Sequence, residues 1–253
     1  MLAQERRLRV EERLRSEGRV SVSELSRAFN VSEETIRRDL ERLEKDGVAR
    51  RAYGGALLNE DEHTETPYDI RKRSSVTEKE LIASLAAGLI RDGEYIMLDE
   101  SSTSFFVAAQ LKRLSDLTVI TNSMEVVDCL GSAPGFTVMC TGGVKRPSAP
   151  SFAGHQAESM VRSYHVDKAI LSCDSLDIDA GYTDRHEDTA LIKRAMMASA
   201  RQVILAADHT KLDRVAFANI GFLKELDCLV TDARPDRRWL EALDNNGVRL
   251  ITP

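Results

Sequence analysis

The sequence predicts a small, mostly helical N-terminal domain with a short β hairpin, followed by a larger α/β domain with a largely parallel sheet. Residues 1–57 carry apolar residues at helical spacing and end in a basic, glycine-containing segment. An acidic stretch ending in Pro67 comes next, and helix-like and strand-like segments alternate beyond it. We therefore expect domains at 1–57 and 69–253, joined by a linker at 58–68.

Composition limits both the class of protein and its partners. Of the 253 residues, 42% are hydrophobic and 30% are charged, which is typical of folded globular chains. Residues 1–57 contain 13 Lys/Arg against 11 Asp/Glu, whereas the remainder contains 22 against 30, so a bound nucleic acid should contact the N-terminal domain. No apolar run approaches the ~20 residues of a membrane-spanning helix, so we expect a cytoplasmic protein with no membrane partner.

Two helices are expected before residue 30. Leu8 and Leu14 stand among charged residues and indicate a short amphipathic helix over 3–16, which Gly18 can end in a left-handed conformation. Residues 21–24 read Ser-Val-Ser-Glu and match a capping box, so a second helix should begin there. The buried face of that helix should consist of Leu25, Ala28 and Phe29.

A third helix is expected after a tight turn. Asn30 can adopt the left-handed conformation that ends the second helix, Val31 fills the turn, and Ser32 caps the next helix. This order of features predicts a helix-turn-helix. Apolar residues at i, i+4 and i+7 predict the buried stripe of the third helix, formed by Ile36, Leu40 and Leu43. The polar side chains that should point away from that stripe are Thr35, Arg37, Arg38 and Arg42.

A basic hairpin is expected after the third helix. Gly47 closes the helix, and residues 48–56 read as two short extended runs around a Gly54-Gly55 turn, with Arg50 and Arg51 in the first run. Such a hairpin would be a wing that contacts the DNA backbone, while residues near the start of the third helix would face base edges. Arginine suits both tasks because its planar guanidinium pairs bidentately with phosphate or guanine.

The same charges have a second explanation. Arg37 and Arg38 stand at helical spacing from Glu33, Glu34 and Glu41, so the third helix could simply present a solvated face of ion pairs. The caps, the tight turn, the arginine face and the basic hairpin nevertheless occur in the order that DNA binding requires. We therefore favour double-stranded DNA as the partner of this domain.

Two motifs in this domain are specific: residues 32–40 read Ser-Glu-Glu-Thr-Ile-Arg-Arg-Asp-Leu, and residues 53–56 read Tyr-Gly-Gly-Ala. They resemble the motifs of the DeoR family of bacterial transcriptional repressors. The resemblance implies a winged helix-turn-helix that binds operator DNA. The residues that it implies as operator contacts are Ser32, Thr35, Arg37 and Arg38, together with Arg50 and Arg51 in the wing.

The alternating segments beyond the linker predict the α/β domain. Helices are expected at 79–90, 104–111, 124–130, 190–200 and 239–243. Strands are expected at 95–98, 117–121, 136–140, 169–171, 203–206, 229–231 and 248–251. Ligands of open parallel sheets bind beyond the carboxyl ends of the strands, so the residues that follow each strand carry the functional prediction.

Those residues are rich in hydroxyl and acidic groups. The segments that follow strands include 99–104, 121–123, 141–143 and 208–211. A hydroxyl run that opens a helix supplies amides and Ser/Thr donors for a phosphate, a strand-end carboxylate can accept hydrogen bonds from sugar hydroxyls, and Lys211 can supply positive charge. Each segment could instead be only a helix cap, a turn or a solvated loop. Their shared position favours a polyhydroxy phosphate ligand.

This part of the chain also resembles the DeoR family. The resemblance implies a sensor domain with a fold similar to ribose-5-phosphate isomerase, whose effector, a phosphorylated sugar, releases the repressor from DNA. The residues that it implies as effector contacts are Asp99, Ser101, Ser102, Thr103, Ser104, Asn122, Lys193 and Lys211.

Ser101 replaces the usual glycine of the family and Ser104 replaces a threonine. If that glycine needs positive φ, serine costs about 1 kcal/mol or more and reshapes the loop. The paired serines, with Ser-Cys-Asp at 172–174, resemble the fucose-operon branch, which hints at a deoxy-sugar phosphate.

A sugar-phosphate isomerase carrying a DNA-binding module is the alternative function, with Asp99 or Glu100 as the base. The five histidines and four cysteines show no metal-binding spacing, and no nucleotide-binding or nucleophile-elbow motif is present, so we expect no metal, no cofactor and no catalytic residues. One small module makes few base contacts, so we also expect a homo-oligomer, either a dimer or a tetramer.

Overall fold

The computed structural model describes residues 3–58 and 66–253 and divides the chain into two compact units, Met1–Ser74 and Ser75–Pro253. Both described ends of the predicted linker lie in secondary structure. Strand β3 extends through Leu58, and helix α4 begins at Tyr68 and ends at Arg73. Residues 59–65, the rest of that linker, lie outside the described residues.

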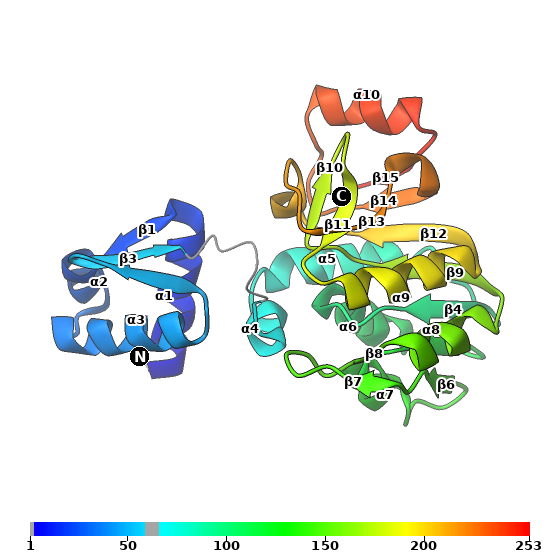
Figure 1. Cartoon of the computed structure of the whole chain (residues 1–253), viewed down its shortest axis with the longest axis horizontal. Helices are drawn as coiled ribbons and strands as arrows, with labels where there is room; N and C mark the ends of the chain where they lie inside the picture. Colours follow the sequence, from blue (N-terminus) through cyan, green and yellow to red (C-terminus); the bar gives the residue numbers. More distant parts are fainter. Residues whose placement is uncertain (1–2, 59–65) are drawn as a thin grey trace. The chain divides into compact units, whose positions relative to one another are not determined.

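The first unit contains a winged helix-turn-helix, as the sequence predicts (Figure 1). Its elements before α4 are α1 (Ala3–Glu17), β1 (Arg19–Ser21), α2 (Val22–Phe29), α3 (Glu33–Lys45), β2 (Ala49–Ala52) and β3 (Gly55–Leu58). The three strands form an antiparallel sheet in the order β1-β3-β2. Asn30 adopts the left-handed conformation after α2, at φ 51° and ψ 51°, and the predicted stripe of α3 is buried.

Two predictions for α2 are wrong. Ser21 occupies the N-cap position, but its side chain accepts no capping hydrogen bond, and its Oγ instead lies 2.9 Å from Ser23 Oγ. Ser21 is the last residue of β1, a strand that the sequence did not predict, and it pairs there with Gly55. Ala28 is exposed, whereas Val22 is buried with Leu25, because the chain enters α2 directly from the sheet.

The hairpin between β2 and β3 turns at Tyr53 and Gly54, one residue earlier than predicted. Gly54 has a φ of +78°, which favours glycine at this position. Gly55 lies in β3 itself, and a Cβ placed there would approach the carbonyl oxygen of Val20 to 2.0 Å. Glycine at 55 therefore lets β1 and β3 lie side by side.

The second unit is built on a seven-stranded parallel sheet, which confirms the predicted α/β class. The strand order is β15-β14-β12-β9-β4-β5-β6. In chain order these strands are β4 (Tyr95–Leu98), β5 (Thr118–Thr121), β6 (Thr137–Cys140), β9 (Val166–Leu171), β12 (Ala200–Ala206), β14 (Cys228–Val230) and β15 (Arg249–Ile251). All seven overlap strands expected from the sequence.

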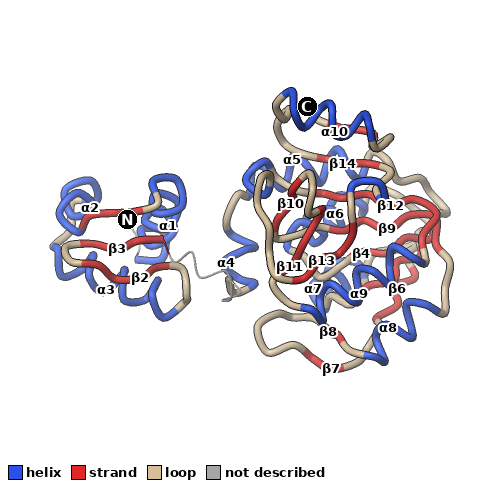
Figure 2. The backbone as a smooth tube through the Cα atoms, turned by 45° about the horizontal axis from the view of Figure 1, so that its top comes forward, coloured by secondary structure: helices blue, strands red, loops and turns tan. Residues whose placement is uncertain are grey.

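Helices cover both faces of this sheet (Figures 1 and 2). They are α5 (Val76–Ala87), α6 (Ser102–Leu111), α7 (Met124–Leu130), α8 (His155–Arg162), α9 (Glu187–Ala198) and α10 (Arg237–Asn245). Alternate residues of each strand point to opposite faces. In β4, Met97 belongs to the core beside α9, whereas Ile96 and Leu98 belong to the core beneath α5 and α6.

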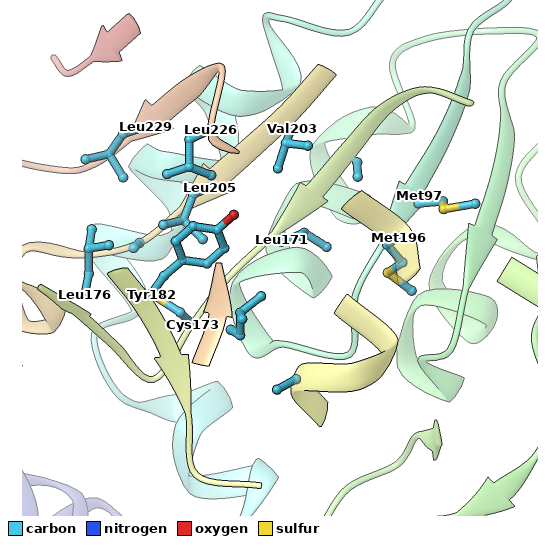
Figure 3. Packing of buried hydrophobic residues seen from close by; sticks show 14 of the residues in the cluster. Met97, Leu171, Cys173, Leu176, Tyr182, Met196, Val203, Leu205, Leu226 and Leu229 are labelled. Atoms are coloured by element: carbon cyan, nitrogen blue, oxygen red, sulfur yellow. The ribbon is translucent and has the colours of Figure 1, made fainter. Parts of the chain in front are cut away.

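The sequence did not predict a second, antiparallel sheet in this unit. It consists of β10 (Ser175–Asp177), β11 (Gly181–Asp184) and β13 (Ala218–Gly221). Tyr182 of β11 is fully buried, and Figure 3 shows its ring among Leu176, Leu205 and Leu226. A hairpin of β7 (Val144–Lys145) and β8 (Phe152–Ala153) was also missed, because strands of two to four residues have too little periodicity to detect.

The remaining elements are the short 3-10 helices η1 (His209–Lys211) and η2 (Leu223–Glu225). No helix within residues 3–58 and 66–253 is long and apolar enough to cross a membrane. The four cysteines are all free thiols. Burial raises the pKa of the Cys173 thiol well above its ordinary value, so this thiol stays protonated.

Candidate functional site

The start of α3 presents the polar residues that the sequence assigns to operator contact. Ser32 caps the helix by accepting a hydrogen bond from the Thr35 amide at 3.2 Å, and its Oγ lies 2.9 Å from Thr35 Oγ1. The side chains of Arg37 and Arg38 are 47% and 76% exposed. The cap therefore fixes the first turn, and both guanidinium groups project into solvent one turn later.

These arginines pair with neighbouring glutamates. Arg37 lies 2.8 Å from Glu33, and Arg38 lies 3.4 Å from Glu34. These contacts are the ion pairs of the alternative explanation, so the unbound domain does present a solvated charged face. Exposed pairs of this kind contribute only about 0–1 kcal/mol, and DNA phosphates or bases can therefore replace the glutamates at little cost.

The wing is held against α3 by an arginine of its own. Arg51 Nη1 contacts Glu41 at 2.9 Å, and the Arg51 amide donates to Glu44 at 3.2 Å. Arg50 is exposed. A groove of about 340 Å³ lies between α3 and the wing. It is lined by Val22, Arg37, Leu40, Arg51, Ala52, Tyr53, Gly54 and Gly55.

Two structural features of this domain were not predicted from the sequence. Tyr53, at the hairpin turn, is fully exposed and offers an aromatic ring beside the arginines. Asp39 faces the core of the domain, where Arg6 Nε of α1 donates to its Oδ2 at 2.6 Å. Both partners are at least nine-tenths buried, so this pair lies on the same inward side of α3 as the apolar stripe and holds that side against α1. Helical spacing could have shown that Asp39 points inward, because it stands three residues after Ile36 and four before Leu43.

In the second unit, six of the eight predicted effector residues follow β4 or β5, beside the point where the strand order reverses, whereas Lys193 lies in α9 and Lys211 in η1. From β4 the sheet runs through β5 and β6 on one side, and through β9, β12, β14 and β15 on the other. Loops at such a reversal point diverge, which leaves room for a ligand beyond the carboxyl ends of the strands. The segment after β4 contains Asp99 to Ser104, and the segment after β9 begins with Ser172.

Asp99 ties these two segments together. Its Oδ1 accepts from the Ser101 amide at 3.1 Å and from Ser104 Oγ at 2.5 Å, and its Oδ2 accepts from the Ser172 amide at 2.8 Å. Asp99 and Ser104 are both fully buried. Their hydrogen-bonding groups are used within the protein, so they order the loop from beneath.

Ser101 does not strain the loop. Its φ is −66° and its ψ is 152°, an ordinary extended conformation, and its side chain caps α6 by accepting from the Ser104 amide at 3.0 Å. The expected penalty for replacing glycine is therefore absent. Ser102 and Thr103 form the first turn of α6, where backbone amides have no carbonyl partner within the helix.

Lys193 lies in a buried network with Asp99. Its ammonium group contacts Asp184 Oδ2 at 2.7 Å, the Ser172 carbonyl oxygen at 2.8 Å and Asp99 Oδ2 at 3.3 Å. These three acceptors match the three N–H bonds of an ammonium group. Burial would lower the pKa of Lys193, but Asp184, Asp99 and Glu100 raise it well above its ordinary value. Lys193 is thus charged, and all three of its N–H bonds have an acceptor within the protein.

A second cationic group lies after β12. Asp208 caps η1 by accepting from the Thr210 amide at 3.0 Å, and η1 contains the half-buried Lys211. Burial alone would raise the pKa of Asp208, but Lys211, the hydrogen bond from Thr210 and then Lys79 lower it below its ordinary value. Lys79 of α5 is buried and was not predicted.

Asn122, at the end of β5, lies beside Glu100. Its Nδ2 donates to Glu100 Oε2 at 2.9 Å and to the Phe152 carbonyl oxygen at 2.9 Å. Arg146 Nη1 lies 4.0 Å from Glu100 Oε1. Neither Glu100 nor Arg146 was predicted as a contact of the effector. Arg146 comes from the β7–β8 hairpin, which the sequence did not reveal.

Metal ions are not indicated by the geometry. Within residues 3–58 and 66–253, no group of three or more His, Cys, Asp or Glu side chains is arranged to hold one. Asp99 and Asp184 are instead paired with Lys193, and Asp99 also accepts from hydroxyl and amide donors.

Comparison with known proteins decides the family. The model of the DeoR-like helix-turn-helix domain matches residues 6–62, and the model of the DeoR C-terminal sensor domain matches residues 74–233. The chain belongs to the DeoR family of transcriptional regulators. Its first unit is the family's DNA-binding domain and its second unit is the family's sensor domain.

Several DeoR regulators are similar over nearly their whole length. The putative aga operon transcriptional repressor of Escherichia coli O157:H7 is 34% identical, with 98% of this chain and 93% of the relative covered. The repressor GlcR of Bacillus subtilis is 35% identical, with 99% and 96% covered. The glycerol-3-phosphate regulon repressor of Escherichia coli K12 is 31% identical, with 94% of each covered.

Similar solved structures match parts of the chain. Ribose 5-phosphate isomerase A from Methanocaldococcus jannaschii is 17% identical, with a TM-score of 0.41 and 55% of each chain covered. The eIF2B beta subunit from Chaetomium thermophilum is 15% identical, with a TM-score of 0.47, and covers 71% of this chain and 54% of its own.

Proposed function

We propose that this DeoR regulator represses a carbohydrate-catabolism operon and that a phosphorylated sugar, bound in the second unit, releases it from its operator. The supporting observation is that one chain contains both features: an exposed arginine surface on α3 and the wing, and a buried hydroxyl-rich loop where the strand order of the sheet reverses. The names of relatives that repress the aga operon and the glycerol-3-phosphate regulon favour the same role. Because its partner is chromosomal DNA, we assign the protein to the cytoplasm.

In the proposed complex, α3 lies in the major groove of operator DNA. Ser32, Thr35, Arg37 and Arg38 contact bases and phosphates, while Arg50 and Arg51 of the wing contact the backbone. Two or more copies bind together, so operator half-sites lie about 10 bp apart or at a multiple of that spacing. A DNase footprint confined to one half-site would contradict this arrangement.

The proposed phosphate site is the first turn of α6. The amides and hydroxyl groups of Ser102 and Thr103 donate hydrogen bonds to the phosphate, at the positive end of the helix dipole. Lys211 supplies a positive charge from η1. Asp99, Ser101, Ser104 and Lys193 hold the loop in shape through their contacts with one another and with Ser172. Release follows if the effector binds the off-DNA state more tightly than the DNA-bound state.

Thr103→Ala and Lys211→Ala test this assignment. Both variants should bind operator DNA as the parent does but should need at least about tenfold more effector for release, because each loses a donor to the phosphate. The measurement is fluorescence anisotropy of operator DNA titrated with the sugar phosphate that most stabilises the parent in a thermal-shift panel. Lys112→Ala, at the opposite end of α6, is the matched control. Normal release by both test variants would place the phosphate elsewhere.

A sugar-phosphate isomerase is the alternative. An isomerase base must reach a substrate C–H bond, yet both Asp99 oxygens accept hydrogen bonds from protein groups, and Glu100 accepts one from Asn122. This geometry favours a sensor without catalysis. Conversion of ribose 5-phosphate by the purified protein, followed by NMR, would overturn that choice.

A further inference from the structure

Two fully buried oxygen atoms near the proposed effector site have no hydrogen-bond partner in the structure. They are Asn122 Oδ1, after β5, and Ser151 Oγ, just before β8, and both residues are 0% exposed. Buried polar atoms in folded proteins are nearly always hydrogen-bonded, because leaving them unpaired costs free energy. Their unused hydrogen-bonding capacity therefore indicates that a bound molecule can pair with them.

The orientation of the Asn122 amide is fixed by its neighbours. Its two partners are the Glu100 carboxylate and the Phe152 carbonyl oxygen, and both can only accept hydrogen bonds. The NH₂ group must therefore face them, which leaves Oδ1 turned away. A molecule that binds at Oδ1 must supply a hydrogen-bond donor.

Ser151 lies directly beside Asn122. It belongs to residues 146–152, here called the strap, which cross the loop after β5. The Phe152 amide donates to the Asn122 carbonyl oxygen at 2.9 Å, the Met124 amide donates to the Pro150 carbonyl oxygen at 2.8 Å, and Ser151 forms a β-bridge with Ser123. The strap thus runs beside residues 122–124 and carries a second buried oxygen that has no hydrogen-bond partner.

The two ends of this region suit different chemical groups. The Asn122 end contains the acceptor Oδ1 and the nearby Glu100 carboxylate, with Arg146 4.0 Å from that carboxylate. A phosphate dianion cannot donate a hydrogen bond to Oδ1, and Glu100 repels it. Sugar hydroxyl groups both donate and accept, so they match Asn122 Oδ1 and Ser151 Oγ. The first turn of α6 offers donors and matches the phosphate.

We propose that Asn122 and Ser151 form a subsite for the hydroxyl groups of the effector, with the phosphate directed to α6. This inference rests on the proposed function and adds the orientation of the ligand and two residues that recognise its sugar part. Because both residues are 0% exposed, binding at these oxygens requires a local opening of the segments that surround them.

Ser151→Ala tests the subsite. The parent's probe is chosen by thermal shift from ribose 5-phosphate, 2-deoxyribose 5-phosphate, fructose 6-phosphate and glycerol 3-phosphate, and its Kd is measured by calorimetry on the full chain. The variant should bind that probe about tenfold more weakly, or about 1.4 kcal/mol. Its unliganded Tm should equal or exceed the parent's, because the hydroxyl group makes no hydrogen bond in the free protein.

Ser199→Ala is the matched control. Ser199 is also buried, but its hydroxyl donates to the Val161 carbonyl oxygen at 3.3 Å, and it directly precedes β12, at the amino-terminal end of that strand and away from the proposed subsite. This control should lose Tm and keep the parent's Kd. An unchanged Kd in Ser151→Ala would mean that the two oxygens bind only water, which overturns the subsite. A parent that binds none of the four probes would overturn the proposed sugar-phosphate effector itself.

Discussion

The arginines of α3 and the lysine of α9 both pair with carboxylates, yet the two sets of ion pairs differ in what surrounds them. Arg37 and Glu33 are each about half exposed, at 47% and 48%. Lys193, Asp99 and Asp184 are at most 5% exposed. Water screens the first pair and barely reaches the second network, so their energies differ even though the contact distances are similar.

The difference separates exchangeable contacts from fixed ones. A solvent-exposed arginine can trade a glutamate for a phosphate, because both states are hydrated and close in free energy. A buried ammonium group with three acceptors cannot turn to a ligand without leaving two carboxylates unpaired. The same reasoning makes Lys193 a determinant of the loop's shape, whereas the α3 arginines are free to meet DNA.

Lys193→Met should have the largest effect on folding. It leaves Asp99 and Asp184 buried without their counter-ion, so the second unit should lose about 3–5 kcal/mol of unfolding free energy. The fluorescence of Trp239, the one tryptophan of the chain and a buried residue of α10, reports urea unfolding of this unit. Arg201→Met, which disrupts a surface pair with a side chain 84% exposed, should change stability by less than about 0.5 kcal/mol. If Lys193→Met lost less than about 1 kcal/mol of unfolding free energy, the buried network would not differ in energy from the exposed ion pairs.

Arg38→Ala should leave folding almost unchanged but weaken operator binding by about 1–3 kcal/mol and relax the base preference. The measurement is anisotropy with a selected operator and with unrelated DNA. Arg51→Ala provides the contrast, because a wing contact to phosphate should weaken binding to both DNAs equally and reduce the salt slope by about 1. If Arg38→Ala lost the same binding free energy on both DNAs, Arg38 would contact the DNA backbone and not the bases.

His209 offers the smallest effect. It is half exposed, and the hydrogen bond of its Nδ1 to Asp232 at 2.7 Å raises its pKa. Because the folded pKa lies above the unfolded value, the stabilisation is complete below the ordinary histidine pKa and is lost as pH rises through the raised value. The stability advantage of the parent over His209→Asn should therefore shrink between pH 6 and pH 8, by less than about 1 kcal/mol. An advantage that grows with pH would contradict the assigned pair.

Local chemistry made much of the first unit predictable. Asn30, Ser32 and the stripe of Ile36, Leu40 and Leu43 act through neighbours a few residues away, and each is found as predicted. The prediction of a capping box at Ser21 was wrong because Ser21 pairs with Gly55 of β3, a strand that is distant in the sequence. A tertiary partner thus overrode a local signal.

In the second unit, the parallel strands were predictable because their apolar runs are continuous. The network around Lys193 was not, because Asp184 belongs to β11, a four-residue strand of a sheet that the sequence did not reveal. Ser151 and Arg146 were hidden for the same reason, since two-residue strands position them. Sequence motifs located the loop after β4, but the long-range pairs decide which of its residues remain available.

The buried contact between Arg6 and Asp39 has a consequence for engineering this regulator. Together with the buried stripe of α3, this contact holds one side of the helix against α1, so the buried side is separate from the exposed side that we propose contacts DNA. If α3 lies in the major groove as proposed, residues at positions 35, 37 and 38 should be exchangeable for others that recognise different base pairs without a rotation of the helix. Substitutions at single positions should then change the operator preference one base pair at a time, provided that the buried contact between Arg6 and Asp39 is kept.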